Sequence, residues 1–217
     1  MKRRIILAGG GGFLGRVLAR SFLARGDEVL ILTRSPQGRI PGAREVEWDA
    51  KNPGDWVEEL NGAEAVINLT GRSVDCRYTA KNRDQILRSR VESTRVLGEA
   101  MARCDQPPRT WLNCSSATIY KHSFQHPMDE TGKVEATPEA KDEFSIHVVQ
   151  QWEQALEAAP TPQTRKVAMR AAMVLGRDGG VFPIFRRLTR LGLGGQMASG
   201  RQMVSWIHEH DFCRAVD

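Results

Sequence analysis

The sequence predicts an α/β fold with a doubly wound parallel sheet, in which helices cover both faces of the sheet. Short apolar runs alternate with longer stretches of helical periodicity, and this alternation is typical of strands joined by crossover helices. The first apolar run leads through a glycine-rich turn straight into a helical pattern. With 217 residues and 41% hydrophobic content, the chain has the length and composition of one domain.

The expected elements follow in chain order. Residues 5–8 form a compact buried strand, and residues 13–25 form a helix that Gly26 ends. The apolar stripe of this helix consists of Leu14, Val17, Leu18 and Phe22. We expect further strands at 29–33, 45–48, 65–69, 111–115 and 167–170, and a long helix at 80–103. Loops are expected at 35–43, 122–142 and 192–200, and another helix at 211–216.

Composition argues against several classes of protein. The sequence has no run of about 18 to 20 apolar residues, so we expect no membrane span. The basic start lacks the long apolar run of an export signal, and the four cysteines form no CxxC pair. Both observations favour a cytoplasmic protein with free thiols. The net charge is +5, but the arginines are spread along predicted helices, which disfavours nucleic-acid binding.

Gly9, Gly12 and Gly15 form a GxxGxxG pattern between the first strand and the first helix. We expect Gly9 to permit a tight turn, Gly12 to let a pyrophosphate approach the backbone, and Gly15 to let the helix pack closely on the strand. The N–H groups at the start of the helix, at Phe13 and Leu14, would then point at the phosphates. The turn therefore predicts a dinucleotide site.

The end of the second strand indicates which dinucleotide binds. Sites for NAD usually carry an acidic residue there, which holds the ribose hydroxyls. This chain has Arg34 and Ser35 instead, and a guanidinium with a hydroxyl suits a 2′-phosphate. Asp27 and Glu28 are acidic but open the strand, at the other end of the sheet. We therefore expect NADP, with Arg34 as an ordinary surface arginine as the alternative.

Several motifs together resemble the extended short-chain dehydrogenase/reductases, in particular their atypical, epimerase-like branch. The motifs are GGGGFLG at 9–15, NLTG at 68–71, SSATIY at 115–120, WE at 152–153, VLG at 174–176 and WIH at 206–208. The resemblance implies a Rossmann fold, with Asn68, Leu69, Thr70 and Gly71 at the cofactor. It also implies a small-molecule substrate, with nucleotide sugars among the candidates, and leaves a homodimer open.

The same resemblance bears on the domain organisation. It implies that residues 1–217 form the NAD(P)-binding domain and that a smaller substrate region begins at about 176–217. Because members of the branch typically continue well beyond the WIH segment, we expect that region to be largely missing from this sequence.

Enzymes of this superfamily use a serine and a YxxxK pair, in which the lysine favours ionisation of the tyrosine. Ser116 matches the serine, but Phe144 and Val148 stand where the tyrosine and lysine are expected. We take Tyr120, near the end of the serine strand, as the replacement proton donor. Packing of Tyr120 as a plain aromatic side chain remains the alternative.

Other titratable side chains are weaker candidates for the site. Tyr78 and His147 are two further possible donors, although His147 on a helix surface is the simpler interpretation. His208, His210 and Asp211 are spaced like metal ligands, but residues two apart point to different sides of an element, so we expect no metal.

The leading hypothesis is an NADP-binding oxidoreductase or epimerase-like protein that lacks the YxxxK pair. The alternative is a noncatalytic NADP-binding sensor or interaction protein. Phe144 and Val148 favour the alternative, whereas Ser116 favours an enzyme.

Overall fold

A computed structural model describes residues 2–196 and 199–217, and a six-stranded parallel sheet forms its centre. The strand order is β3-β2-β1-β4-β5-β6. The strands are β1 (Arg4–Ala8), β2 (Glu28–Thr33), β3 (Arg44–Glu47), β4 (Ala65–Asn68), β5 (Thr110–Ser116) and β6 (Arg165–Ala171). Each agrees with a predicted strand to within two residues. The doubly wound sheet is therefore confirmed.

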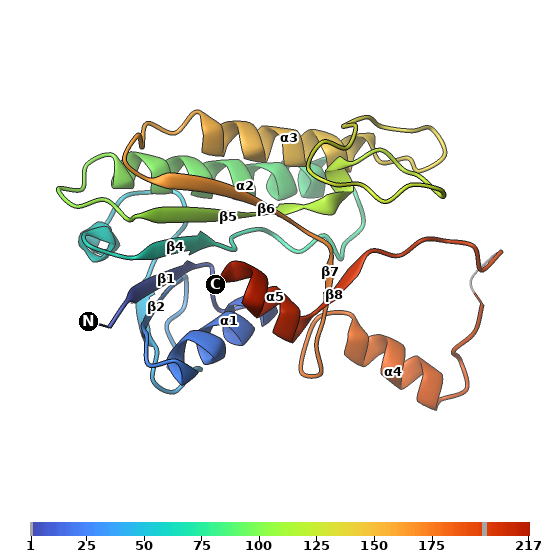
Figure 1. The fold of residues 1–217 in the computed structure, drawn as a ribbon, viewed down its shortest axis with the longest axis horizontal. Helices are drawn as coiled ribbons and strands as arrows, with labels where there is room; N and C mark the ends of the chain where they lie inside the picture. The colour runs from blue at the N-terminus through green and yellow to red at the C-terminus, as the bar shows by residue number, and fades with distance from the viewer. Residues whose placement is uncertain (1, 197–198) are drawn as a thin grey trace.

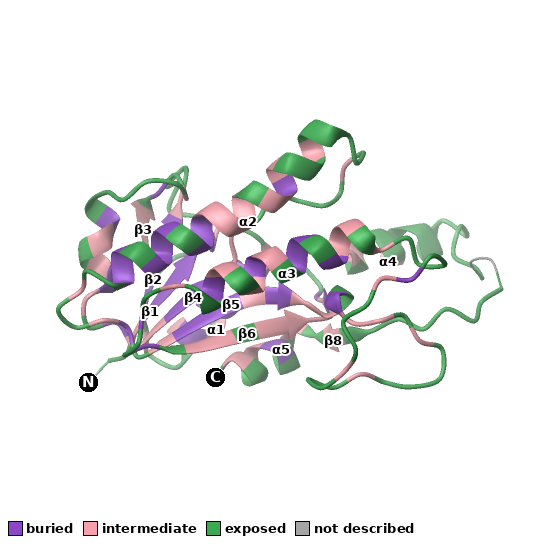
Figure 2. Ribbon diagram, turned by 90° about the horizontal axis from the view of Figure 1, so that it is seen from above, coloured by how far each residue is buried: buried purple, intermediate pink, exposed green. Residues whose placement is uncertain are grey.

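Helices cover both faces of the sheet (Figure 1). α2 (Ala80–Met101) and α3 (Glu143–Glu157) lie on one face, and α1 (Phe13–Ala24) and α5 (Glu209–Val216) lie on the other. Each face has its own apolar cluster: Trp111 and Leu97 are buried in the first, and Leu18 and Phe212 in the second. Figure 2 shows the central strands β1, β2 and β4 largely buried and the edge strands β3 and β6 of intermediate burial, whereas the outer surfaces of α2 and α3 are exposed. Burial on both faces explains why the central strands are continuous apolar runs.

The strand order reverses its direction between β1 and β4. Ala8 at the end of β1 pairs with Leu32 of β2 on one side and with Asn68 of β4 on the other. The segments that follow these three strands therefore emerge side by side at one edge. Ligands of open α/β sheets bind outside the carboxyl ends of the strands at such a reversal, so the topology places the expected cofactor site here.

Some elements were not predicted from the sequence. β7 (Met173–Leu175) and β8 (Trp206–His208) pair in parallel as a small second sheet (Figure 1), and a 3₁₀ helix, η1, spans Asp55–Leu60. Another short 3₁₀ helix, η2 (Ala117–Ile119), follows β5. In contrast, α4 (Phe182–Arg190) was expected, because the sequence places Arg186, Arg187 and Arg190 along a helix. Strands of three residues are too short to show a period of two.

The C-terminal helix begins earlier than expected. α5 starts at Glu209 because the His208 side chain accepts a hydrogen bond from the N–H of His210 and so caps the helix. Of the loop expected at 192–200, residues 197–198 lie outside the described residues. Along the part of the chain that the structure describes, none of the helices is long and apolar enough to cross a membrane.

Candidate cofactor and substrate site

The glycine turn after β1 has the geometry that a phosphate site needs. Gly9 has a φ of +74°, and a Cβ on it would lie 2.7 Å from the Thr70 hydroxyl oxygen. Gly12 is exposed at the N-cap of α1, and a Cβ there would meet no atom within 4 Å. Gly15 was expected to permit packing on the strand, but a Cβ there would overlap the Gly10 backbone of the turn itself.

The first residues of α1 face the turn in different ways. Gly12 makes no side-chain cap, so the N–H groups of the first helical turn are available to a ligand. The ring of Phe13 packs against the backbone of Gly176 and Gly179, so any contact of Phe13 with a phosphate would come from its N–H group. Leu14 packs partly buried against the core below the sheet.

The end of β4 forms the opposite wall of the site. The Asn68 side chain is fully buried: its amide donates to Thr94 (3.1 Å) and Asn113 (2.7 Å), and its Oδ1 accepts from the N–H of Thr70 (3.1 Å). Asn68 thereby fixes the Thr70 turn from below. Among the described residues, the buried Thr70 hydroxyl has no hydrogen-bond partner. Buried hydroxyls are normally paired, so this one is a candidate ligand contact.

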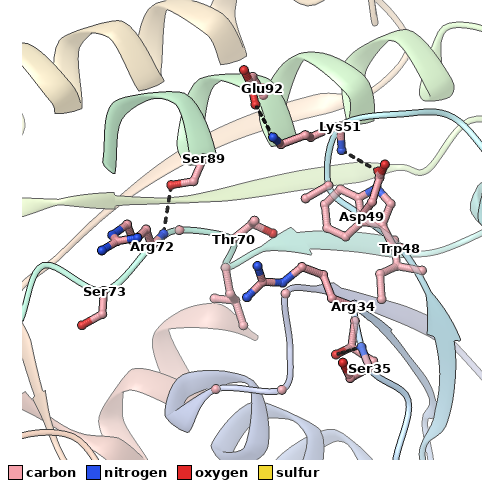
Figure 3. Close-up of a pocket in the computed structure, with 18 of the residues that line it drawn as sticks. Arg34, Ser35, Trp48, Asp49, Lys51, Thr70, Arg72, Ser73, Ser89 and Glu92 are labelled. Carbon is pink, nitrogen blue, oxygen red and sulfur yellow. Dashed lines mark hydrogen bonds and ion pairs between the residues drawn. The ribbon is translucent and has the colours of Figure 1, made fainter. Parts of the chain in front are cut away.

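The loop after β2 brings a cation to the site. Arg34 is exposed, and its side chain extends across toward Thr70 (Figure 3). Within residues 2–196 and 199–217, no hydrogen bond or ion pair engages the Arg34 guanidinium. Asp27 lies at the far end of β2, where Arg3 binds it at 2.9 Å. The carboxyl end of β2 thus presents a cation and no acidic residue.

Glu45 of β3 fixes the loop that follows Arg34. Its carboxylate accepts hydrogen bonds from the backbone N–H groups of Gln37 (2.5 Å), Gly38 (3.0 Å) and Arg39 (3.2 Å). Burial raises the pKa of Glu45, but the three bonds together outweigh burial and hold the pKa below its ordinary value. The loop is thereby held with Arg39 at the lining of the site.

These walls enclose a cleft of about 870 Å³. The predicted cofactor residues on its lining are Gly9, Gly12, Arg34, Ser35, Leu69, Thr70 and Gly71. Sequence reasoning missed further lining residues, which Figure 3 labels: Trp48, Asp49, Lys51, Arg72, Ser73, Ser89 and Glu92. Trp48 and Asp49 could have been found, because they directly follow β3 at the same edge of the sheet.

The predicted catalytic residues lie farther along that edge. Ser116 ends β5, and its hydroxyl oxygen accepts hydrogen bonds from the N–H (3.3 Å) and the hydroxyl (2.9 Å) of Thr118, so it also caps η2. Tyr120 follows η2 and lines a second cavity of about 1100 Å³, together with Arg170 of β6. Ser116 and Tyr120 thus flank one short helix at the carboxyl end of β5.

A comparison with known proteins identifies the family. Residues 5–217 match the model of the NAD dependent epimerase/dehydratase family. The chain belongs to this family. Epimerase family protein SDR39U1 from Bos taurus is 33% identical over 211 residues, which cover 96% of this chain and 67% of that protein. Epimerase family protein SSP1921 from Staphylococcus saprophyticus is 32% identical over 215 residues, covering 99% and 70%. The chain thus spans about two thirds of the length of these relatives.

Solved structures share the fold. Human SDR39U1 (isoform2) with NADPH matches with a TM-score of 0.82 at 32% identity, over 97% of this chain and 67% of that one. A nucleoside-diphosphate sugar epimerase from Corynebacterium glutamicum matches with a TM-score of 0.79 at 26% identity, over 100% and 43%. MoeE5 in complex with UDP-glucose and NAD has a TM-score of 0.77 at 21% identity, which shows the fold alone. A pyridine nucleotide cofactor is supported for this member of the epimerase/dehydratase family.

Phe144 and Val148 stand where the sequence predicts the tyrosine and lysine of the YxxxK pair, and both side chains are apolar. The Phe144 ring meets the Tyr78 ring edge-on at 5.4 Å, and the Arg83 guanidinium lies 4.8 Å from the Phe144 centroid. Val148 is buried on the inner side of α3, whereas His147 is exposed on its surface. Within the described residues, the side chains of Tyr78, Arg83 and His147 make no hydrogen bond to Ser116. Phe144 and Val148 have no side-chain group that could make one.

The histidines near the C-terminus have a structural role. His208 caps α5 through its Nδ1, and His210 lies 4.0 Å from Asp211. Across the described residues, no group of three histidine, cysteine, aspartate or glutamate side chains is placed to hold a metal.

Proposed function

We propose that this protein is an NADP-dependent oxidoreductase, or an epimerase-like enzyme with the same cofactor, that acts on a carbonyl or hydroxyl group of a small molecule. The observation that carries the proposal is Arg34. It is a cation without a partner in the described chain, at the carboxyl end of β2, where an NAD site would have an acidic residue. The NADPH in the human SDR39U1 structure supports this choice of cofactor.

The residues present fit a phosphorylated dinucleotide. The space beside Gly12 is free of protein atoms, as an approaching pyrophosphate requires, and the unpaired Thr70 hydroxyl adds a donor at the opposite wall. Arg34 and Ser35 would hold the 2′-phosphate, and the N–H groups at the start of α1 would hold the pyrophosphate. When bound, such a cofactor supplies or accepts a hydride.

The chain's own residues would then handle the substrate. The Ser116 hydroxyl oxygen accepts from Thr118 and, within the described residues, its O–H donates no hydrogen bond, so the O–H is available to a substrate oxygen. Tyr120 would exchange a proton with that oxygen. Nucleotide sugars are among the candidate substrates, because the Corynebacterium glutamicum protein at 26% identity is named a nucleoside-diphosphate sugar epimerase. The four free cysteines fit a reducing compartment, and we place the protein in the cytoplasm.

Calorimetric titration with NADPH and NADH tests the cofactor. We expect NADPH to bind more tightly than NADH. Arg34→Asp should narrow or invert the ratio of these two affinities, since a charge-assisted hydrogen bond contributes about 1.5–3 kcal/mol, or about 10- to 100-fold in affinity. Arg103→Asp makes the same charge change at an exposed residue outside the cleft and should leave the ratio unchanged. Equal affinities of the wild type for NADPH and NADH would exclude the proposed role of Arg34.

A noncatalytic NADP-binding protein is the second candidate, and the burial of Val148 favours it. A lysine relay cannot form at a position that is 4% exposed without burying an ammonium group. If the protein binds NADPH tightly but none of the carbonyl compounds tested causes it to oxidise NADPH, the sensor or interaction role is the better assignment.

A further inference from the structure

Tyr120 contacts the guanidinium of Arg170, which lies on the neighbouring strand. The Arg170 Nη1 donates a hydrogen bond of 3.0 Å to the Tyr120 phenolic oxygen, and the guanidinium carbon lies 5.1 Å from the centroid of the ring. Both residues line the second cavity. A cation that donates to a phenol oxygen stabilises the phenolate left when the phenol gives up its proton. The lysine of a YxxxK pair stabilises the phenolate of its tyrosine in the same way.

Other residues hold Arg170 in place. Glu153 of α3 accepts from the Nε and Nη2 of Arg170, both at 2.9 Å, which is a bidentate pair of fixed geometry. The Ser115 hydroxyl donates to the same carboxylate at 2.5 Å. β5 and β6 are neighbouring strands (Figure 1), and in their register Ser115 lies opposite Arg170, so backbone pairing and side-chain bonds agree. Arg170 is left with one orientation, in which Nη1 points at Tyr120.

We propose that Tyr120 is the proton donor of this site and that Arg170, braced by Glu153 and Ser115, is the positioning residue that replaces the missing lysine. The inference rests on the proposed oxidoreductase function. During reduction, the substrate carbonyl carbon would receive a hydride from a reduced nicotinamide dinucleotide, and its oxygen would take the proton of the Tyr120 hydroxyl. The electron pair of the broken O–H bond would stay on the phenol oxygen, beside Arg170, until a proton from solvent replaces the one transferred. Oxidation runs the same steps in reverse.

Chemical modification tests the pair without requiring turnover. Tetranitromethane attacks phenolates, and the chain has only two tyrosines, Tyr78 and Tyr120, so mass spectrometry of the peptides gives the nitration of each. Tyr78 is 40% exposed, and although the Arg83 guanidinium lies 5.9 Å from its ring centroid, no side chain of the described residues donates a hydrogen bond to its phenol oxygen, which makes it the internal reference. We expect Tyr120 to be nitrated faster than Tyr78, and Arg170→Gln to slow Tyr120 about tenfold although it opens the site. Arg170→Lys should restore part of the rate, and Glu153→Gln should have an intermediate effect.

Steady-state kinetics tests the catalytic role, with NADPH and 4-nitrobenzaldehyde as the probe. Tyr120→Phe should lower kcat about 10²- to 10⁴-fold with little change in the KM for NADPH. Tyr78→Phe is the matched control and should leave kcat unchanged.

The outcomes separate the pair from the proposed function. If Arg170→Gln leaves Tyr120 nitration unchanged or raises it, the pairing is wrong. If the wild type turns over the aldehyde and Tyr120→Phe is as active, Tyr120 is not the donor. If nitration depends on Arg170 but the wild type oxidises no NADPH, the activated phenol is supported and the proposed oxidoreductase function fails.

Discussion

A side chain at Gly12 should abolish cofactor binding without harming the fold. The residue is the N-cap of α1, its φ of −79° and ψ of −175° are accessible to any residue, and a Cβ would meet no protein atom within 4 Å. Gly12→Val should therefore cost about 1 kcal/mol of helix capping at most, which lowers Tm by about 2–4 °C in a chain of this size. A pyrophosphate, in contrast, needs the space that the valine would fill.

The expected loss of affinity follows from the hydrogen bonds at stake. Displacing the pyrophosphate from two backbone N–H groups at the start of α1 would remove about 1.5–3 kcal/mol each, or about 10²- to 10⁴-fold in Kd. NADPH fluorescence titration measures the affinity, and thermal denaturation measures the stability. Gly195→Val is a matched control, because Gly195 is equally open and does not line the cleft. Wild-type affinity in Gly12→Val would show that the phosphates bind elsewhere.

Three further predictions concern residues that hold the walls of the cofactor cleft or brace Arg170 at the second cavity. Glu45→Gln should loosen the loop at 35–39, because it removes a charged acceptor of three backbone N–H groups. We expect NADPH binding to weaken about tenfold in a fluorescence titration and NADH binding to stay unchanged. An equal loss of affinity for both nucleotides would contradict this prediction. Asn68→Ala should lower the free energy of unfolding in urea by about 1–3 kcal/mol, because it leaves Asn113 and the Thr70 N–H without their partner; a stability within error of wild type would argue against it. Burial raises the pKa of Glu153, but the hydrogen bonds from Arg170 and Ser115 outweigh burial, so the pKa of Glu153 in the folded state is depressed. The stability that ionised Glu153 contributes is therefore complete above its unfolded pKa of about 4.3 and should be lost as pH falls through the folded pKa. Glu153→Gln should remove this part of the acid dependence of the free energy of unfolding, as measured by urea unfolding between pH 3 and about pH 7.

The sheet could be predicted from the sequence because its central strands are buried on both faces. Residues 5–8 and 29–33 are short apolar runs, each followed by residues typical of turns, which favours buried strands, and the glycine turn fixes where the first helix begins. The small sheet of β7 and β8 could not be predicted in this way. Its two strands are separated by about 30 residues, and their pairing depends on the tertiary packing of α5 against α1.

The candidate site divides along the same line. The glycine turn and Arg34 were found because their roles follow from local sequence, immediately after β1 and β2. Lys51 and Ser89 were missed because they carry no local motif and reach the cleft only through the strand order and the placement of α2. The Arg170 contact with Tyr120 was missed for the same reason, since 50 residues separate the two and only the pairing of β5 with β6 brings them together.

The burial of Val148 disfavours a charged relay residue at this position of α3. An ammonium group at position 148 would replace a side chain that is 4% exposed, and a buried charge without a partner is strongly disfavoured. Arg170 avoids this cost, because it lies at the end of a strand beside a cavity and Glu153 balances its charge. The same carboxylate leaves one donor of the guanidinium pointing at Tyr120. A scaffold that keeps an apolar α3 can therefore still hold a cation beside a phenol, provided that the cation comes from the strand edge.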